Sequence, residues 1–262
     1  MSDSGKKLFS QEMREVTRSI HNKSDTMVNA KLGVTMSDDS VWAEGLLVFY
    51  EIFKYLEDAL DRYKDSLIGD LLIPGMSRTH AFENDLDHYL GNWRDEYIIR
   101  PEVQAYLEHL RKLEADNPYL LIAYIYHLYM GLFSGGQVLR AKRFLSLSSV
   151  DKDGGNSVTS YEDTSIGSLK KQLKAAINTL VDNLDTDTRQ GILEEGINVF
   201  KLNNTIIASV KGVDIVLRRR LLKLLIAVIL LVLFLLTFVY STGTSEHVEM
   251  ESYSLEKDKL EL

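Results

Sequence analysis

Close to its C-terminal end the chain carries twenty consecutive residues, 221–240, in which Lys223 is the only charged side chain. At a rise of 1.5 Å per residue, a helix of this length spans roughly 30 Å, the thickness of a bilayer core. Lys223 lies near one end of the run, where its ammonium group can reach the polar interface. The run therefore predicts a transmembrane anchor at residues 218–240, with the basic flank Arg218 to Arg220 on the cytosolic side.

The anchor sets the expected domain organisation. Residues 1–8 are expected to be a flexible N-terminus, residues 9–217 one helical domain facing the cytosol, and residues 241–262 a short acidic tail on the far side. The start of the chain lacks the apolar run of a signal peptide. The last four residues, Lys-Leu-Glu-Leu, are similar to the Lys-Asp-Glu-Leu retrieval signal with one substitution, which favours the endoplasmic reticulum membrane.

Apolar periodicity predicts an all-α fold, since prolines are few and strand-like alternation is scarce. Either Asp39 or Ser40 is expected to cap the second helix. The stretch 145–164, rich in Ser, Asp and Gly, is expected to be a loop. The helices are expected at residues 9–32, 40–63, 78–93, 101–112, 120–144, 166–184 and 186–215.

Composition excludes several classes of function. The chain has no cysteine, which removes disulfides, thiolate metal sites and cysteine nucleophiles. Its net charge of −8 argues against a general nucleic-acid binder. The sequence has no phosphate-binding Gly-x-x-x-x-Gly-Lys, and a zinc site is not expected, because the spacing of the following histidines does not suit one. They are His80, His88, His109 and His247.

Three glycines, Gly131, Gly135 and Gly136, interrupt the helix expected at 120–144. Each costs roughly 0.5–1 kcal/mol relative to alanine in a helix interior. Gly131 and Gly135 are four residues apart and share a face, which leaves the backbone bare there. A close helix–helix crossing and a flat ligand both explain such a face. The doublet and the bend that it permits favour a ligand, but the pattern alone does not decide.

Two cationic clusters accompany the glycines. Arg14, Arg18, His21 and Asp25 form one stripe of the first helix, and Lys170, Lys171 and Lys174 make a later helix basic. A solvated surface explains either cluster. Arginines are also suited to an anionic ligand, since the guanidinium group binds carboxylates in a forked geometry.

Residues 131–139, Gly-Leu-Phe-Ser-Gly-Gly-Gln-Val-Leu, resemble the distal helix of the heme (haem) oxygenases, Gly-Asp-Leu-Ser-Gly-Gly-Gln-Val-Leu. The likeness extends to residues 118–124 and to Ser19-Ile20-His21, and it covers roughly residues 9–210. With its C-terminal anchor, the chain resembles the animal-type, membrane tail-anchored members of that family. This resemblance implies a single multi-helix domain followed by a transmembrane helix.

The resemblance also assigns roles to individual residues. His21 matches the axial histidine that binds heme iron, and Gly131 and Gly135 match the distal glycines that pack over the heme face in the catalytic pocket. The remaining matches are heme-binding residues. Arg14, Lys170 and Lys174 fall where the family holds the propionates, and Tyr126 falls near the same edge.

The activity implied is oxidative cleavage of heme, both substrate and cofactor, to biliverdin, iron and carbon monoxide. It uses O2 and electrons from NADPH, delivered by a cytochrome P450 reductase-type flavoprotein. Heme, this reductase and the membrane are therefore the expected partners, and nucleic acid is not.

The chain departs from the family in the distal pocket. Leu132 replaces the distal aspartate, Phe53 a tyrosine and Leu128 an arginine, which together hold a proton-delivering water network. Losing all three at once is coherent, because a half-satisfied buried network is worse than none. We expect slower turnover and relaxed regiospecificity. His127 lies about 100° around the helix from Leu128 and is not assumed to substitute.

Two other functions stay open at this point. A non-catalytic heme-binding or heme-sensing protein would keep His21 and the glycines but not the proton relay. A tail-anchored helical adaptor without a cofactor would need the nine-residue match to be coincidental.

Overall fold

The computed structural model describes residues 7–31, 38–145, 154–161 and 164–260, and the regular elements of these residues are all helical, which confirms the all-α prediction. The chain divides into two compact units, Met1–Val213 and Asp214–Leu262. The first unit contains α1 (Phe9–Val16), α2 (Arg18–Lys31), α3 (Asp39–Arg62), α4 (Thr79–Leu90), α5 (Pro101–Asp116), α6 (Leu121–Gly131), α7 (Gln137–Leu145), α8 (Ile166–Val181) and α9 (Thr186–Ala208).

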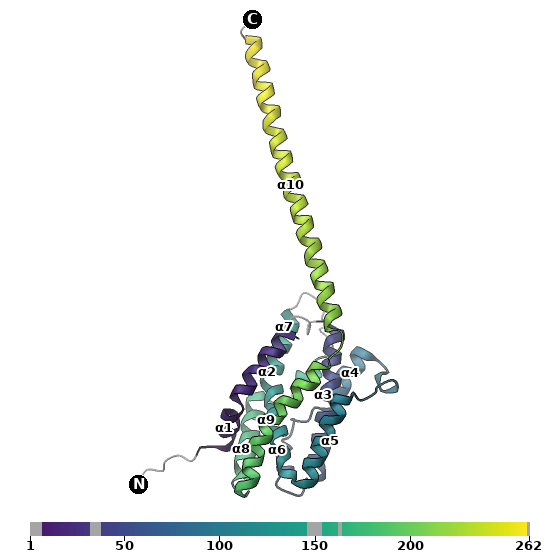
Figure 1. Ribbon diagram of the computed structural model, residues 1–262, viewed down its shortest axis with the longest axis vertical. Helices are drawn as coiled ribbons and strands as arrows, with labels where there is room; N and C mark the ends of the chain where they lie inside the picture. Colours follow the sequence, from purple (N-terminus) through teal and green to yellow (C-terminus); the bar gives the residue numbers. More distant parts are fainter. Residues whose placement is uncertain (1–6, 32–37, 146–153, 162–163, 261–262) are drawn as a thin grey trace, which may run out of the picture. The chain divides into compact units, whose positions relative to one another are not determined.

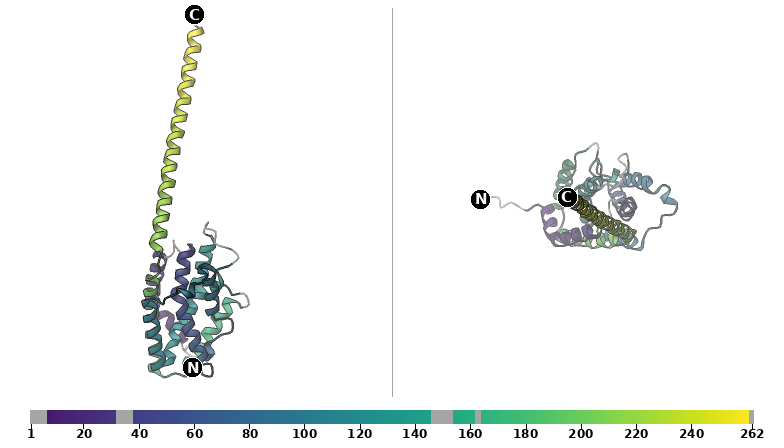
Figure 2. Two further views of the ribbon diagram at one scale, coloured as in Figure 1. Left: turned by 90° about the vertical axis from the view of Figure 1, so that its right-hand side faces the viewer. Right: turned by 90° about the horizontal axis from the view of Figure 1, so that it is seen from above.

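The long helices of the first unit run alongside one another, as the views in Figures 1 and 2 show. α3 packs against α4, α5, α6 and α9, and α6 packs against α8 and α9 as well. Residues 121–126 of α6 are all buried, so this helix lies in the interior of the unit. Burying a large apolar side chain stabilises the fold by about 1.5–3 kcal/mol, which makes α6 a central support.

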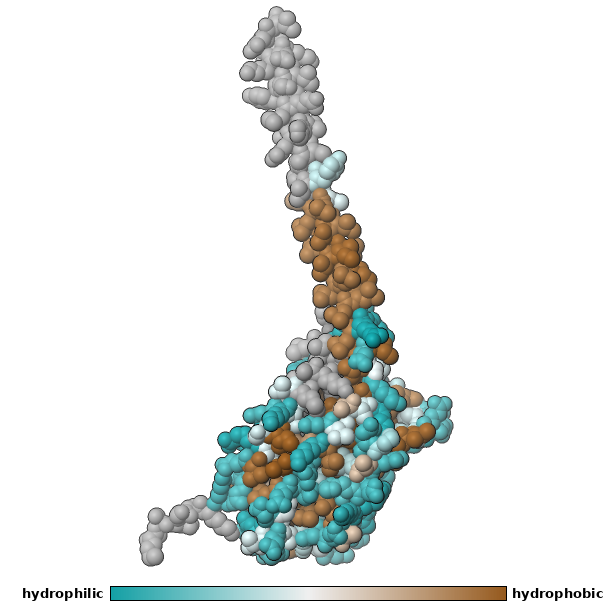
Figure 3. Space-filling model, viewed as in Figure 1, coloured by the Kyte–Doolittle hydropathy of each residue, from teal (hydrophilic) through white to brown (hydrophobic). Residues whose placement is uncertain are grey.

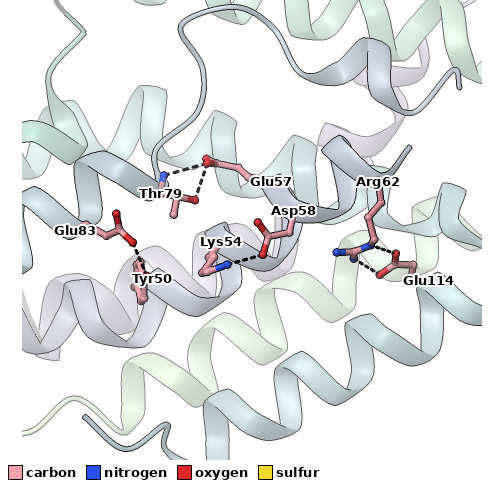
Figure 4. Close-up of polar contacts among 8 residues, drawn as sticks. All are labelled: Tyr50, Lys54, Glu57, Asp58, Arg62, Thr79, Glu83 and Glu114. Carbon is pink, nitrogen blue, oxygen red and sulfur yellow. Dashed lines mark hydrogen bonds and ion pairs between the residues drawn. The ribbon is translucent and has the colours of Figure 1, made fainter. Parts of the chain in front are cut away.

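Polar side chains fix α3 to its neighbours. Figure 4 shows Glu57 accepting hydrogen bonds from the backbone N–H (3.1 Å) and the hydroxyl (2.6 Å) of Thr79, at the start of α4. The carboxylate of Glu57 also accepts from the hydroxyl of Tyr129 in α6 at 2.6 Å. Further along α3, Arg62 binds Glu114 of α5 through two nitrogens. Glu57 therefore joins three helices, with its charge satisfied by donors.

A buried carboxylate attaches the segment 154–161 to α4. Asp85 is fully buried and accepts hydrogen bonds from the backbone N–H groups of Ser157 (2.7 Å) and Val158 (2.9 Å). Burial is the main cause that raises the pKa of Asp85, and these hydrogen bonds oppose that shift. The side chain thus holds one wall segment of the cavity described below.

The N-terminal helices differ from the sequence prediction. The helix expected at 9–32 breaks at Thr17, whose hydroxyl donates to the carbonyl of Met13. A threonine hydroxyl that competes for a helical carbonyl often bends a helix in this way. The predicted cap was one residue off, because Asp38 accepts from the backbone N–H of Ser40. Residue 32, the predicted end, lies outside the described residues.

The glycine-bearing helix and the last helix of the unit also differ from the prediction. The stretch expected as one helix at 120–144 consists of α6, a π-helical turn at Leu132–Gly136 and α7. The helix expected at 186–215 ends at Ala208, and Gly212 then adopts a φ of +81°, a conformation that favours glycine.

The described residues of the second unit all lie in one helix, α10 (Val213–Leu260), whose first residue belongs to the first unit. Residues Val213–Phe238 are long and apolar enough to cross a membrane, with a mean hydropathy of 3.0 and no buried residue in the most apolar window. Figure 3 shows this apolar band. The helix continues past 240, as no proline follows Pro118. The last two residues of the retrieval-like sequence, 261–262, lie outside the described residues.

Replacing Asp85 by alanine is expected to lower the free energy of unfolding by about 2–4 kcal/mol, because two buried backbone N–H groups lose a charged acceptor. The matched control is Asp87→Ala, since Asp87 is an exposed acceptor on the same helix that binds Arg94 and Trp93. The control should cost less than about 1 kcal/mol. Urea unfolding of the full chain in detergent micelles, followed by tryptophan fluorescence, measures both. Equal losses would show that the buried contact has no special weight.

Candidate functional site

The first unit contains a partly open cavity of about 990 Å³, at the upper end of the range for ligand sites. Its walls come from α1 and α2 on one side, the α6–π–α7 segment on another, and α3, α8 and α9 between them. Every residue that the sequence proposed for the site lines this one cavity. These residues are Arg14, His21, Tyr126, Gly131, Gly135, Lys170 and Lys174.

Bare backbone faces the cavity at the π-helical turn. A Cβ atom built on Gly131 or Gly135 would meet no atom of another described residue within 4 Å. A helix–helix crossing at these glycines is therefore wrong, because a crossing helix would occupy that space. Gly136 differs, since a Cβ there would lie 3.0 Å from Cδ1 of Leu132. Gly131 and Gly135 thus give a flat ligand access to the backbone, and Gly136 makes room for a neighbouring side chain.

An imidazole lines the cavity from α2. The ring of His21 meets the ring of Phe200 of α9 edge-on, with the centroids 5.4 Å apart. His21 lies one helical turn after Thr17, and its backbone N–H donates to the carbonyl of that residue. The break between α1 and α2 therefore sets where the helix that carries His21 begins. Asp25, the fourth member of the predicted stripe, has a side chain outside the described part of the chain.

Cationic side chains line the cavity from three helices. Arg14 and Arg18 come from α1 and α2, and Lys170 and Lys174 come from α8. Lys171, between the two lysines, does not line it. The spacing of four residues puts Lys170 and Lys174 on one face of α8 and Lys171 on another. This group of positive charges suits a ligand that carries carboxylates.

Tyr126 has a structural contact that the sequence did not indicate. Its hydroxyl donates a hydrogen bond of 3.1 Å to the backbone carbonyl of Ser10 in α1. Burial raises the pKa of Tyr126, and the nearby charge of Arg14 opposes this shift. The side chain therefore joins α6 to α1 and holds two walls of the cavity together.

The three residues predicted to make the distal pocket apolar all line the cavity. Phe53, Leu128 and Leu132 come from α3, α6 and the π-helical turn. The Phe53 ring packs against the rings of Phe82 and Tyr129, with centroids 5.1 and 5.2 Å apart. This wall offers no side-chain hydrogen bond to a ligand.

Polar residues that the sequence analysis did not select line the rest of the cavity. Four lining residues have a buried nitrogen or oxygen without a hydrogen-bond partner among the described residues, namely Ser24, Trp42, His127 and Asn204. Such groups are rare and call for a missing partner. A polar residue in an otherwise apolar helix was the available signal for His127, whereas α9 is rich in polar residues and gave no such signal for Asn204. Periodicity does not show which side chain faces a cavity.

Burial lowers the pKa of His127 to about 3, and the nearby charge of His21 contributes to the same shift. An imidazole with this pKa is neutral near pH 7. No group of three or more His, Asp or Glu side chains that could hold a metal occurs in the part of the chain that the structure describes. A metal bound beside His21 would therefore bring most of its own ligands.

Together these features fit heme. A flat ring can lie against the bare backbone, its carboxylates suit the cations, and its iron suits an imidazole. The polar atoms without partners and the open space at Gly131 and Gly135 are what a cavity shaped around a bound molecule leaves behind.

The family model for Heme oxygenase matches residues 7–209. Heme oxygenase 1 of Gallus gallus is 31% identical over 205 residues, which cover 74% of this chain and 67% of that protein. The structure of heme oxygenase 2 from Chlamydomonas reinhardtii without heme has a TM-score of 0.70 and 28% identity, over 78% of this chain and 98% of that one. A heme complex of heme oxygenase-1 from Synechocystis, at 24% identity, matches in fold with a TM-score of 0.74, over 84% of this chain and all of that one.

Gly131 and Gly155, a glycine outside the cavity lining with a positive φ, are expected to respond differently to replacement by alanine. Gly131→Ala should leave the free energy of unfolding unchanged or raise it by up to about 1 kcal/mol, because its Cβ enters open space and alanine favours a helix. Gly155→Ala should lower it by about 1–3 kcal/mol, because Gly155 has a φ of +69° and its Cβ would lie 2.3 Å from the hydroxyl of Tyr89. Urea unfolding of the heme-free protein tests both. Destabilisation by Gly131→Ala would mean that the face is packed.

Proposed function

The chain belongs to the heme oxygenase family and is a heme-degrading enzyme, and on that premise we propose that the cavity described above is its heme site. The observation that carries this proposal is that His21 and the bare backbone of Gly131 and Gly135 line one cavity, with open space at both glycines. Heme would lie between α2 and the π-helical turn.

Each group of residues has a task in this site. His21 would hold the iron of bound heme through its imidazole. Arg14, Lys170 and Lys174 would pair with the two propionates and so stabilise these negative charges in the bound state. Gly131 and Gly135 would let the ring approach the backbone, where any side chain would take up the same space. Tyr126 would keep α1 and α6 at the separation that the ligand needs, through its bond to Ser10.

Bound heme would supply both the iron that activates O2 and the ring carbon that is cut, giving biliverdin, iron and carbon monoxide. The residues around the ring would control water and shape. Phe53, Leu128 and Leu132 would exclude water from their side of the cavity, and none of them can hold or transfer a proton there. We infer slower turnover and weaker control over the position of the cut than a polar wall would give.

We further propose that electrons come from NADPH through a cytochrome P450 reductase-type flavoprotein. The support is the match of residues 7–209 to the family, whose reaction consumes reducing equivalents.

Residues 218–240 are proposed as an animal-type tail anchor, with residues 9–217 as the cytosolic domain and residues 241–262 on the far side. The apolar stretch of α10 and the basic flank before it support an anchor with this orientation. The retrieval-like end of the chain supports the endoplasmic reticulum membrane.

The full chain in lipid nanodiscs, given heme, O2, NADPH and the reductase, is expected to lose its Soret band as biliverdin appears. Turnover should be slow. Chromatography should resolve more than one biliverdin isomer, because the apolar side chains of Phe53, Leu128 and Leu132 give weak control over which ring carbon is cut. A single isomer formed rapidly would contradict the role given to Phe53, Leu128 and Leu132. A Soret band that persists while the iron is reduced would instead favour a protein that binds heme without degrading it.

Lys174→Gln is expected to weaken heme binding about 2- to 5-fold at low salt, because one propionate loses a partly exposed cation. The difference should shrink as salt is raised. Lys171→Gln is the matched control, since Lys171 lies on the same helix outside the cavity lining and should leave the affinity unchanged. Titration of the heme-free protein followed at the Soret band measures both. Equal effects of the two substitutions would mean that only net charge matters.

A further inference from the structure

Three polar side chains from three helices meet outside the heme cavity. They are His109 of α5, Tyr124 of α6 and Glu195 of α9. Nε2 of His109 lies 2.8 Å from the hydroxyl oxygen of Tyr124 and 2.9 Å from Oε2 of Glu195. The hydroxyl of Tyr124 donates to the same carboxylate oxygen at 2.5 Å. This triad has no task in the function proposed above.

The three atoms of the triad have nearly the spacing of metal ligands. Ligands that lie about 2.1 Å from an ion, at right angles to one another, are separated by roughly 3 Å. Separations of 2.5, 2.8 and 2.9 Å therefore arrange one nitrogen and two oxygens like the corners of one face of an octahedron. A small outward movement of the side chains would admit an ion between them.

The negative charge of the triad has no lysine or arginine beside it. The side chain of Glu195 is only 13% exposed. Besides His109 and Tyr124, its carboxylate accepts from the side-chain amide of Asn198 at 3.1 Å, and no lysine or arginine of the described residues forms a salt bridge with it. Buried charges in proteins are paired or coordinate metals. With His109 neutral, the carboxylate lacks a counter-charge that a cation would supply.

The ligand types favour a divalent transition-metal ion. Imidazole and oxygen ligands without a thiolate suit iron and its neighbours better than soft metals. A carboxylate and a phenolate together carry two negative charges, so a divalent ion held by them and a neutral imidazole forms a complex without net charge. Partial burial favours such a complex. The ion can reach the triad from solvent, because the side chain of His109 is 31% exposed.

One side chain separates the triad from the heme cavity. The ring of Tyr106 packs against that of Tyr124, with the centroids 5.8 Å apart. The hydroxyl of Tyr106 donates at 3.1 Å to Oδ1 of Asn203, which lines the cavity. Because heme cleavage releases iron, iron is the transition metal that this chain itself supplies close to the triad.

We propose that His109, Tyr124 and Glu195 form a binding site for a divalent transition-metal ion, and that the iron released from heme is its occupant. The ion binds Nε2 of His109, Oε2 of Glu195 and the phenolate oxygen of Tyr124, whose proton passes to solvent, and no electron is transferred. Only the source of the iron rests on the proposed function. Sequence spacing does not reveal the site, because its ligands lie 15 and 71 residues apart along the chain.

Metal binding at the triad competes with a proton. Burial is the main cause that raises the pKa of Tyr124, and the hydrogen bond to Glu195 adds to the shift. Since the bound form needs the phenolate and a neutral imidazole, the affinity for the metal is expected to rise between about pH 6 and pH 8, with release of protons.

The test titrates the heme-free full chain, in phosphatidylcholine nanodiscs under argon, with Co²⁺, whose visible absorption changes when it binds nitrogen and oxygen ligands. We expect a single saturable site from which Fe²⁺ displaces the cobalt. Glu195→Gln and His109→Gln keep hydrogen-bonding groups and should weaken Co²⁺ binding at least ~10-fold. Tyr124→Phe should weaken binding as well and lower the proton release measured with a pH indicator.

Two controls locate the metal. His80→Gln changes an exposed histidine whose Nδ1 lies 3.7 Å from the carboxylate of Glu83 on the surface of α4, and it should leave the Co²⁺ affinity unchanged. His21→Ala removes an imidazole of the heme cavity and should also leave it unchanged. Unchanged heme affinity in Glu195→Gln would show that this variant keeps the fold.

Equal Co²⁺ affinity of the wild type and Glu195→Gln would overturn the metal site, as would loss of Co²⁺ binding in His21→Ala. Failure of Fe²⁺ to displace cobalt would overturn the assignment of iron. Heme binding is titrated separately on the same chains. A chain that binds cobalt through the triad but binds no heme would refute the proposed heme site and not the metal site, so the two failures are distinguishable.

Discussion

The fold depends on keeping a cavity of about 990 Å³ open inside a helical protein. Protein interiors pack as densely as organic crystals, and empty volume costs stability, so walls of this kind collapse unless they are held. Hydrogen bonds between helices hold the cavity walls apart here. Tyr126 fixes α6 to α1 through the carbonyl of Ser10, and Glu57 fixes α3 to α4 and α6. Glu57 does not line the cavity, whereas Tyr126 both joins two helices and forms part of the cavity surface.

The π-helical turn determines which glycines of the motif expose their backbone to the cavity. An α-helix through Leu132–Gly136 would keep one register, whereas the π turn inserts an extra residue and rotates the following helix. The result is that Gly131 and Gly135 meet open space while Gly136 accommodates Leu132. A residue with a side chain at either open position would put its atoms where a flat ligand lies. The glycines therefore destabilise the helix at the positions where the ligand needs bare backbone.

Much of the helical framework was predictable, because apolar residues repeat at helical spacing and Asp, Ser and Pro mark the starts of helices. The resemblance of the motif around Gly135 to the family also predicted from the sequence that His21, Arg14 and Lys174 belong to one site. Three features were not predictable for physical reasons. Thr17 breaks a helix through a hydrogen bond that its sequence neighbours do not reveal, the π turn has the same composition as a bent α-helix, and the orientation of His127 depends on a glycine nearly seventy residues away, Gly196.

The polar and apolar parts of the cavity surface come from overlapping sets of helices, since α6 carries both Leu128 and His127. Phe53, Leu128 and Leu132 all line the cavity, and none of these side chains could donate a hydrogen bond to a lone buried carboxylate. Unpartnered hydrogen-bonding groups lie instead at Ser24 of α2, Trp42 of α3, His127 of α6 and Asn204 of α9. Replacing Leu132 alone by an acidic residue would bury a carboxylate without hydrogen-bond donors. An acidic residue at this position therefore requires polar residues in place of Phe53 and Leu128 as well. The chemistry that the cavity can direct is therefore set by where its hydrogen-bonding side chains lie, and none of them is Phe53, Leu128 or Leu132.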